Sequence, residues 1–372
     1  LFSLWDSEYY LLGEHKMKTG RFDQARADAF AERLLSVLND AALTLMISIG
    51  HRTGLFDVMD ELDFASSEVI AEAAGCNERY VREWLNALVV GGIVDYDAHA
   101  KAYQLPAEHA SFLTRKSSPQ NMAVVAQFIP VLAYVENGVV DAFKHGGGVP
   151  YEAYHRFHEV MAEESGQTIL SSLTDKILPM VHGLVDKLNQ GIQVLDIGCG
   201  YGRALILMAK TYPQSQFTGY DLCDETIAHA VHSAKENKIQ NIHFEKMDLS
   251  VWDEQEKYDL ITSFDVIHDQ AKPAQVLSNV FKALKPQGIF LMQDIKTSSD
   301  VARNVHHPLG ALIYTISCMH CMTVSLSQNG LGLGAAWGEE LAEKMLVEAG
   351  FGKIEKHYLE HDIMNTYYVM RK

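Results

Sequence analysis

The segment 193–203 reads QVLDIGCGYGR and constrains this chain more than any other part of its sequence. A short apolar stretch reaches Asp196, three glycines follow at Gly198, Gly200 and Gly202, and the helical pattern ALILMAKTYP comes next. A glycine-rich turn at a helix start places bare backbone N–H groups beside a ligand in close contact with the chain. We therefore predict a strand, a ligand-binding turn and a helix in this order.

The spacing of these glycines distinguishes between ligands. A dinucleotide fingerprint, GxGxxG, would need its third glycine at position 203, where this chain has Arg203. The chain shows DxGxGxG instead. This pattern resembles the first motif of class I S-adenosylmethionine (SAM) methyltransferases, and the resemblance implies SAM as the cofactor.

Two acidic residues follow at the ends of further predicted strands. FTGYD (217–221) ends in Asp221, which is placed to accept hydrogen bonds from both hydroxyls of a ribose. IHFEKMDL (242–249) contains Asp248, and in the family a carboxylate there accepts from the adenine amine while neighbouring apolar groups pack on the base. The resemblance implies a cofactor site formed by Asp196, Gly198, Gly200, Gly202, Asp221, Leu222, Asp248, Leu249, Phe264 and Asp265.

The remaining strands complete an α/β fold. YDLITSFDVIHD (258–269) is the next predicted strand segment, and GIFLMQDI (288–295) follows after a helix and a KPQG turn. KIEKHYLE and NTYYVMRK close the chain as two strands with no helix between them. The resemblance implies a Rossmann-like, seven-stranded methyltransferase sheet with an antiparallel C-terminal hairpin, preceded by a mainly helical winged-helix domain.

Length and composition set the limits for the whole chain. With 372 residues we expect two domains, and 48% hydrophobic with 21% charged residues is typical of a soluble globular protein. The net charge of -17 argues against nucleic acid or an anionic membrane as a partner. Five cysteines without a pattern and the lack of a secretory signal favour the cytoplasm. Because the chain begins with Leu1 and a more ordinary segment opens at Met17, we expect residues 1–16 to be upstream sequence or the chain to be a fragment.

The N-terminal part has the outline of a winged helix. Residues 24–50 show apolar positions at helical spacing, which predicts a helix buried in its own domain or across a homodimer. Two helices are predicted at 66–75 and 76–92, joined by a turn at Gly75, and 93–106 resembles a two-stranded wing.

Charge decides between two functions of such a domain. The expected recognition helix carries Glu78, Arg79, Arg82 and Glu83 without net positive charge, and residues 55–75 hold six acids and no Lys or Arg. Binding to DNA phosphates needs cations, so we expect no nucleic acid partner. The domain instead resembles the dimerisation and substrate-covering module of many small-molecule methyltransferases.

A helical segment is predicted between the winged helix and the SAM-binding domain. The segment 116–190 is predicted to be helical and to cover cofactor and substrate, and it places Phe157 and Met161 at helical spacing with Tyr154 and His158. In resembling enzymes an aromatic residue and a methionine of such a helix touch the cofactor. The alternative is that these residues only pack in the core.

The predicted domains are 1–23 (N-terminal extension), 24–115 (winged helix), 116–190 (helical linker) and 191–372 (SAM-binding domain with an insertion at 296–337).

Candidates for catalysis lie beyond the fourth and fifth predicted strands, where a bound methyl donor would face the acceptor. DVIHDQAKP places His268 and Asp269 there, and small-molecule O-methyltransferases resemble this with an HD pair, although Gln270 stands where they have an aromatic residue. In those enzymes the pair often serves structure and cofactor positioning. The predicted catalytic set is His268, His306, His307 and His320, and the predicted substrate contacts are Asp269, Asp294, Tyr314 and Trp337.

Two other interpretations of the insertion were weighed. Its run 308–326 is long and apolar enough for a membrane span, but His320 and scattered Ser and Thr favour a buried helix and no membrane partner. Cys318 and Cys321 have CxxC spacing, yet without a second pair a closed zinc site would have to recruit distant histidines, so no metal is predicted.

Taken together, the residues and the resemblance predict SAM-dependent methyl transfer to a heteroatom of a small molecule. A hydroxyl acceptor is favoured, because the histidine-rich insertion can supply a base near neutral pH. A thiol or amine acceptor, a SAM-sensing winged-helix transcriptional regulator and a scaffold that has lost catalysis remain as alternatives.

Overall fold

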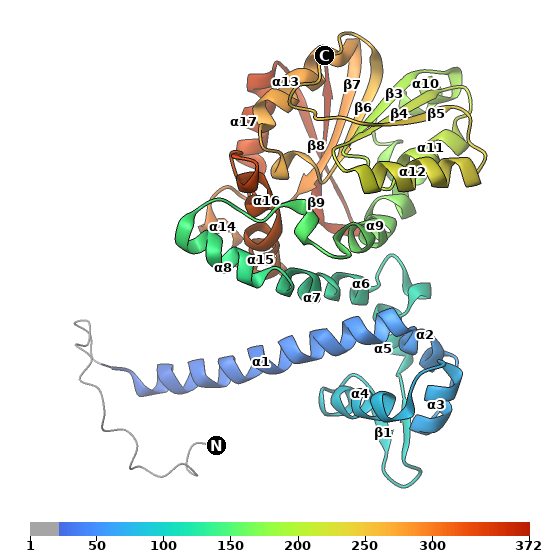
Figure 1. Cartoon of the computed structure of the whole chain (residues 1–372), viewed down its shortest axis with the longest axis vertical. Coiled ribbons are helices and arrows are strands. Elements are labelled where there is room, and N and C mark those ends of the chain that lie inside the picture. The colour runs from blue at the N-terminus through green and yellow to red at the C-terminus, as the bar shows by residue number, and fades with distance from the viewer. Residues whose placement is uncertain (1–21) are drawn as a thin grey trace. The chain divides into compact units, whose positions relative to one another are not determined.

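A computed structural model describes residues 22–372 and divides the chain into two units, Leu1–Leu43 and Thr44–Lys372. Helix α1 (Gln24–Thr53) contributes its first part to one unit and its last part to the other (Figure 1). The expectations about residues 1–16 and Met17 fall outside the described residues.

The winged helix is present as predicted. Asn77 caps α4 through its side chain, which accepts from the Arg79 N–H, and Trp84 packs on Phe56 with ring centroids 5.3 Å apart. The arginines of α4 pair with glutamates of the same helix, which leaves no free cation on it. The elements are α2 (Leu55–Asp60), α3 (Ser67–Ala73), α4 (Glu78–Val90), β1 (Asp95–Asp97) and β2 (Ala102–Gln104).

A helical linker follows, again as predicted, and is interrupted by a glycine-rich loop after His145. One detail differs: Tyr154 does not share a helix with Phe157, because it lies after a 3-10 turn (Tyr151–Ala153) and α9 begins at Phe157. The helices are α5 (Ala107–Leu113), α6 (Met122–Ala126), α7 (Phe128–Ala133), α8 (Glu136–His145), α9 (Phe157–Thr168) and α10 (Leu184–Gln190).

Seven strands form one sheet in the order β5-β4-β3-β6-β7-β9-β8. The first five of these pair in parallel, whereas β9 is antiparallel to both β7 and β8, so the C-terminal hairpin is confirmed. The strand order reverses beside β3, and ligands of such sheets bind where it does, at the carboxyl ends of the strands. The strands are β3 (Gln193–Ile197), β4 (Gln216–Asp221), β5 (Ile242–Lys246), β6 (Tyr258–Phe264), β7 (Leu284–Ile295), β8 (Ile354–Leu359) and β9 (Asp362–Arg371).

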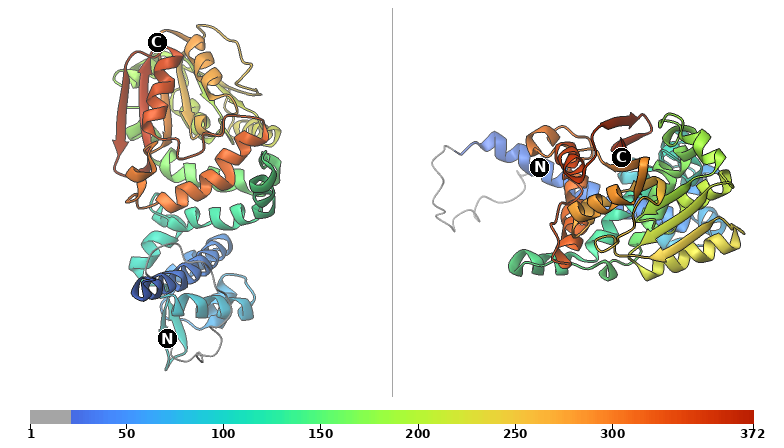
Figure 2. Two further views of the ribbon diagram at one scale, coloured as in Figure 1. Left: turned by 90° about the vertical axis from the view of Figure 1, so that its left-hand side faces the viewer. Right: turned by 90° about the horizontal axis from the view of Figure 1, so that it is seen from above.

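Helices cover both faces of this sheet, as Figures 1 and 2 show. Neighbouring residues of the central strands belong to different cores: Val194 and Leu260 pack with α10 and α11, while Leu195 and Ile261 pack with α13 and α17. This alternation is expected of strands buried on both faces. The covering helices are α11 (Arg203–Thr211), α12 (Asp224–Glu236), α13 (Pro273–Ala283) and α17 (Glu339–Ala349).

The prediction of a KPQG turn before β7 is wrong, because this segment lies within the strand. The strand begins at Leu284, directly after α13, and the segment bulges within it, with a register shift against β6. Gln287 adopts a φ of 65° there, and Pro286 is tolerated because a bulge leaves a residue out of the ladder.

The insertion is helical, with a wide turn in its middle. By length and composition, its run Gly310–Ser327 and α1 could each cross a membrane, and a pair bent by 56° (Met122–Ala133 with Glu136–His145) would count as a third span. Ile313 and Val324 of the run are buried inside the fold, as expected of a buried helix. The elements are α14 (Val301–Asn304), α15 (Gly310–Ile316), a π-helical turn (Ser317–Cys321) and α16 (Met322–Ser327).

Candidate active site

The glycine turn after β3 is shaped by close neighbours. Gly198, Gly200 and Gly202 all have positive φ (63°, 53° and 70°), a region that side chains other than glycine rarely adopt. A Cβ at Gly198 would lie 2.5 Å from Val266, and one at Gly202 would lie 2.5 Å from Phe244, whereas Gly200 faces open space. Backbone at Gly200 is therefore accessible to a ligand at the start of α11.

Asp221 ties this turn to the end of β4. Its Oδ2 accepts a hydrogen bond from the Gly200 N–H at 2.9 Å, and its Oδ1 accepts from the Cys223 N–H at 2.9 Å and the Thr226 hydroxyl at 2.8 Å. A carboxylate has about four acceptor positions, so it can also accept from a ligand. The two features that the sequence predicted as one site do lie together.

The other predicted cofactor residues occupy different surroundings. Asp196 is buried and accepts from the Thr262 hydroxyl at 2.6 Å, and burial raises its pKa to about 7. Asp248 accepts from the Ser250 N–H at 2.8 Å in the turn after β5, where Leu249 is buried and Leu222, after β4, is 44% exposed. Asp196 thus braces β3 against β6, and its contact with the cofactor stays a prediction.

Two acids with raised pKa values, Asp265 after β6 and Glu164 on α9, lie close enough for their charges to interact. Asp265, with a φ of 56°, accepts from the Gln293 amide at 3.0 Å, and burial raises its pKa to about 7 although His268 opposes the shift. Burial, together with the charges of Asp265 and Asp362, raises the pKa of Glu164 on α9 to about 8. The folded chain holds these protons more tightly than the unfolded chain, so their contribution to stability is lost as the pH rises from about 4 to 8.

His268 and Asp294 form a buried pair between the ends of β6 and β7. The imidazole Nδ1 lies 2.8 Å from Asp294 Oδ1, which also accepts from the Trp337 indole N–H at 3.0 Å. Asp294 Oδ2 is buried and has no partner. Burial alone would lower the pKa of His268, but the charge of Asp294 and the hydrogen bond to this carboxylate raise it well above the usual value.

This pairing assigns the tautomer. A carboxylate only accepts, so Nδ1 carries the proton and Nε2 is the basic nitrogen of the neutral ring. A histidine oriented in this way can act as a general base.

The neighbouring Asp269 binds a residue from the linker. The Tyr151 hydroxyl donates a hydrogen bond to its carboxylate, and burial raises the pKa of Asp269 to about 6, with the positive charge of His268 and the Tyr151 bond opposing. His320 lies nearby, with its ring centroid 5.5 Å from that of Tyr151. The structure therefore brings together four predicted residues, namely His268, Asp269, Asp294 and His320.

Three other predicted residues of the insertion lie apart from this group. His306 is exposed, the His307 Nδ1 accepts from the Leu309 N–H at 3.1 Å, and the Tyr314 hydroxyl accepts from the Asn304 amide at 2.9 Å. Their contacts are local to the insertion. Nothing in these contacts places them beside His268.

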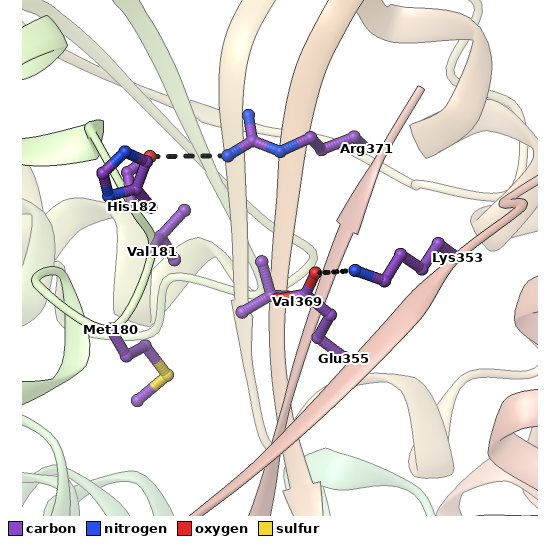
Figure 3. Close-up of a pocket in the computed structure, with 7 residues that line it drawn as sticks. All are labelled: Met180, Val181, His182, Lys353, Glu355, Val369 and Arg371. Carbon is purple, nitrogen blue, oxygen red and sulfur yellow. Dashed lines mark hydrogen bonds and ion pairs between the residues drawn. The ribbon is translucent and has the colours of Figure 1, made fainter.

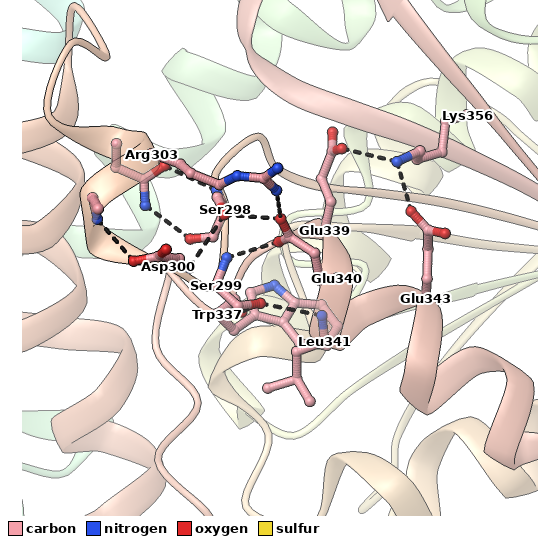
Figure 4. Close-up of polar contacts among 12 residues, drawn as sticks. Ser298, Ser299, Asp300, Arg303, Trp337, Glu339, Glu340, Leu341, Glu343 and Lys356 are labelled. Atoms are coloured by element: carbon pink, nitrogen blue, oxygen red, sulfur yellow. Dashed lines mark hydrogen bonds and ion pairs between the residues drawn. The ribbon is translucent and has the colours of Figure 1, made fainter.

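The insertion is held to the sheet domain by charged groups. Figure 4 shows Glu340 accepting from Ser298, Ser299 and Arg303, while Lys356 pairs with Glu339 and Glu343. The Ser299 N–H and these other donors lower the pKa of Glu340 to about 2. The same segment carries Trp337, so these contacts help to fix the indole that binds Asp294.

One set of metal-ligand atoms is close enough to share a cation. Single ligand atoms of Asp265, His268 and Asp294 all lie within 4.8 Å of one another. Within residues 22–372, the Cys318–Cys321 motif does not form such a set.

A small hollow lies at the other end of the sheet. Figure 3 shows Arg371 donating to the His182 carbonyl and Lys353 beside Glu355, around a cavity of about 160 Å³. Because Arg371 pairs with Ile289, this hollow lies at the amino ends of the parallel strands. Ligands of such sheets bind at the carboxyl ends, so we assign it no role.

Sequence reasoning missed several contributors. Glu164 lies on the buried face of α9 with Phe157 and Val160. An acidic residue at a position where the helical spacing predicts an apolar one could have identified it from the sequence. Tyr151 and Asp362 gave no signal, because only the folded chain brings them to the site.

Comparisons with known proteins agree with this arrangement. Two family profiles match the chain: the Rv2258c-like winged HTH domain over residues 41–115 and the methyltransferase domain over residues 188–350. The solved structure of human N-acetylserotonin methyltransferase in complex with SAM superposes with a TM-score of 0.67 at 18% identity, covering 96% of this chain and 99% of that one. This chain thus combines a methyltransferase domain with an N-terminal Rv2258c-like winged-helix domain.

Other relatives of this methyltransferase differ in acceptor. The mitomycin 7-O-methyltransferase MmcR has a TM-score of 0.66 at 17% identity, covering 94% and 100% of the two chains. Phosphoethanolamine N-methyltransferase 1 of Triticum aestivum is 38% identical over 114 residues, 30% of this chain and 22% of the relative. A malonyl-(acyl-carrier protein) O-methyltransferase of Bacillus cereus is 28% identical over 147 residues, 40% and 49% of the two chains. The chain thus matches less than half the length of these two curated relatives, and the structural likenesses establish the fold alone.

The residues of this methyltransferase fit SAM. The cofactor carries a sulfonium and an ammonium, and the carboxylates of the half-buried Asp265 and the buried Asp294, which has an unpartnered oxygen, suit a cation. Gly200 and Asp221 would hold the nucleoside and amino-acid parts. Phe157 and Met161 belong to a hydrophobic cluster of α7 and α9, so the packing role is present, and their cofactor contact stays a prediction.

We predict that Asp221→Ala lowers SAM affinity by about 10- to 100-fold or more, because each hydrogen bond to a charged group contributes about 1.5 to 3 kcal/mol. Calorimetric titration with SAM measures the change. Asp224→Ala is the matched control, since this acid is three residues away and its side chain is 81% exposed beside Lys246. Equal SAM affinity in the Asp221 variant and the control would contradict the assignment of β4.

Proposed function

We propose that this methyltransferase transfers a methyl group from SAM to a hydroxyl oxygen of a small molecule, with His268 as the general base. The observation that carries the proposal is the buried His268–Asp294 pair at the carboxyl ends of β6 and β7, where the fold binds its ligands. The methyl group of SAM is activated by its sulfonium, so departure of the leaving group needs no acid.

The chain must therefore remove one proton. A hydroxyl is a weak nucleophile at neutral pH, and its proton passes to His268 Nε2 as its oxygen takes the methyl group. Asp294 holds the Nδ1–H and stabilises the imidazolium that forms, and Trp337 fixes Asp294 in turn. Water is excluded by the insertion, since the His268 and Asp294 side chains are only 6% and 1% exposed.

Amines and thiols are the second class of acceptor. They are nucleophilic with less help, and two relatives are named for N-methylation. Such acceptors need an oriented base least, so the presence of the His268–Asp294 pair favours a hydroxyl acceptor. Two relatives are named for O-methylation, in agreement with this choice.

The acceptor can be identified without a prior guess. The protein is incubated with methyl-labelled SAM and a metabolite extract, and labelled compounds are identified by mass spectrometry. We expect a product methylated on oxygen. A labelled product methylated only on nitrogen or sulfur would overturn the proposed hydroxyl chemistry while leaving the methyltransferase assignment intact.

We predict that His268→Gln lowers turnover of that acceptor by about 100- to 10,000-fold, the usual contribution of a general base, with SAM binding retained. In the wild type, kcat/KM should rise with pH as His268 loses its proton, with a midpoint above 6.5 because Asp294 raises the pKa of His268. Asp294→Asn removes that charge and should move the midpoint to lower pH.

Asp300→Asn serves as the control for this profile. Asp300 lies in the same insertion and caps α14, a role that asparagine also performs. An unshifted midpoint in Asp294→Asn, or an equal shift in the control, would show that the titrating group is not His268.

We also propose that the protein is a homodimer formed through α1. Phe30, Leu34 and Leu38 recur every fourth residue on this helix and are 62%, 46% and 67% exposed. A contiguous apolar stripe of this kind is rarely left in water, and a second copy of the same helix is a partner of matching chemistry.

We expect light scattering to give twice the chain mass for the wild type. Leu34→Glu combined with Leu38→Glu should give a monomer, because it places charges in the stripe. Ser36→Glu, on another face of the helix, should leave the dimer intact. A wild-type protein of one chain mass over a wide concentration range would refute the dimer.

A further inference from the structure

His320 occupies an enclosure of aromatic rings. It lies in the π-helical turn Ser317–Cys321 and is 2% exposed. Its ring stacks on Phe157, with centroids 3.6 Å apart and an interplanar angle of 12°. Tyr154 and Tyr151 meet it edge-on at 4.7 Å and 5.5 Å. The position of this imidazole is therefore fixed on three sides.

Neither ring nitrogen of His320 has a hydrogen-bond partner, although both are buried. Burial, together with the positive charges of His268 and His158, lowers the pKa of His320 well below its usual value, so the ring is neutral. A buried polar group without a partner costs free energy, and a phenylalanine would fill the same space without that cost. A neutral imidazole here is understandable if a bound molecule supplies the missing partner.

The contacts around His320 connect it to the proposed base. The next residue, Cys321, lies beside His268, and Tyr151 touches the His320 ring while donating to Asp269, the neighbour of His268. The two imidazoles come from different elements, the turn after β6 and the insertion, and lie near enough for the charge of His268 to help lower the pKa of His320. A molecule whose hydroxyl meets His268 is thus within reach of His320.

Partly buried aromatic rings lie next to the enclosure of His320. Tyr151 stacks on His158 at 6.3 Å, and His158 lies 6.4 Å from Tyr201 in the glycine turn. Planar side chains of this kind favour a flat, aromatic ligand, because ring faces and edges attract each other. Of the acceptors with a hydroxyl, phenols fit this border best.

We propose that His320 recognises a second oxygen on an aromatic acceptor, next to the hydroxyl from which His268 removes the proton. This inference rests on the proposed function and names its acceptor class as phenols with an adjacent oxygen. A neutral imidazole has one donor and one acceptor nitrogen, so it can bind either a hydroxyl or a carbonyl at that position. His320 is a specificity-determining residue in this account, and His268 alone takes the proton.

The test compares two probes that differ by one oxygen, catechol and phenol, each with SAM. We expect the wild type to prefer catechol by at least about 10-fold in kcat/KM, as one buried hydrogen bond allows. His320→Phe keeps the stack on Phe157 and removes both nitrogens, so it should abolish the preference, mostly through KM for catechol, and leave phenol unchanged. Its thermal midpoint should be equal to or above that of the wild type, because an unpartnered polar group is lost.

His307→Phe is the matched control, since His307 lies in the same insertion but outside the aromatic enclosure. His320→Gln, which keeps hydrogen-bonding capacity, should retain part of the preference. An unchanged preference in His320→Phe would overturn the inference, and so would an equal loss with both probes, which would indicate a role in the proton transfer itself.

The labelled-SAM experiment separates this inference from the function on which it rests. If the wild type methylates neither probe, the product identified from the extract shows which of the two proposals fails. A product methylated on oxygen that lacks a second oxygen next to it would overturn only the role of His320. A product methylated on nitrogen or sulfur would overturn the proposed function itself, and an aromatic product with adjacent oxygens supports both.

Discussion

The hydrogen bond between His268 and Asp294 is the interaction around which the rest of the site is arranged. It joins the turn after β6 to the end of β7, two strands that the sheet places side by side. Trp337 reaches the same carboxylate from the end of the insertion, and Cys321 reaches the same imidazole from its middle. One ion pair thus links the sheet to the segment that covers it. Without the pair, the sheet would still form, but the His268 ring would lose the partner that fixes its orientation.

The site also depends on how its negative charge is balanced. Asp265 and Asp269 are half-buried, Glu164 is buried, and all three have raised pKa values, so their ionised forms are disfavoured when no cation is near. A cofactor with a sulfonium and an ammonium would supply positive charge there.

Much of this could be predicted from the sequence, and the reasons are local. The glycine turn, Asp221 and the C-terminal hairpin follow from spacing and periodicity, which depend on neighbouring residues. The bulge at Gln287 could not be predicted, because it depends on pairing with β6 and with the end of β9. The sequence singled out His268 by its place after the fourth predicted strand, but among the three histidines of the insertion it offered no basis for choice. Burial next to Asp294 distinguishes His268, and enclosure by rings distinguishes His320, and both are properties of the tertiary structure.

The wide turn at Ser317–Cys321 has a consequence for how such enzymes diverge. A π-helical turn holds one residue more than an α-helical turn in the same stretch of helix. Loss of a single residue there would convert the run to regular α-helix and rotate one flank of it by about 100° relative to the other. The residue that faces Phe157 would then change, while the glycine turn and the carboxyl ends of β6 and β7 would keep their positions. Acceptor choice can thus evolve by one short deletion, without any substitution in the parts that hold the methyl donor.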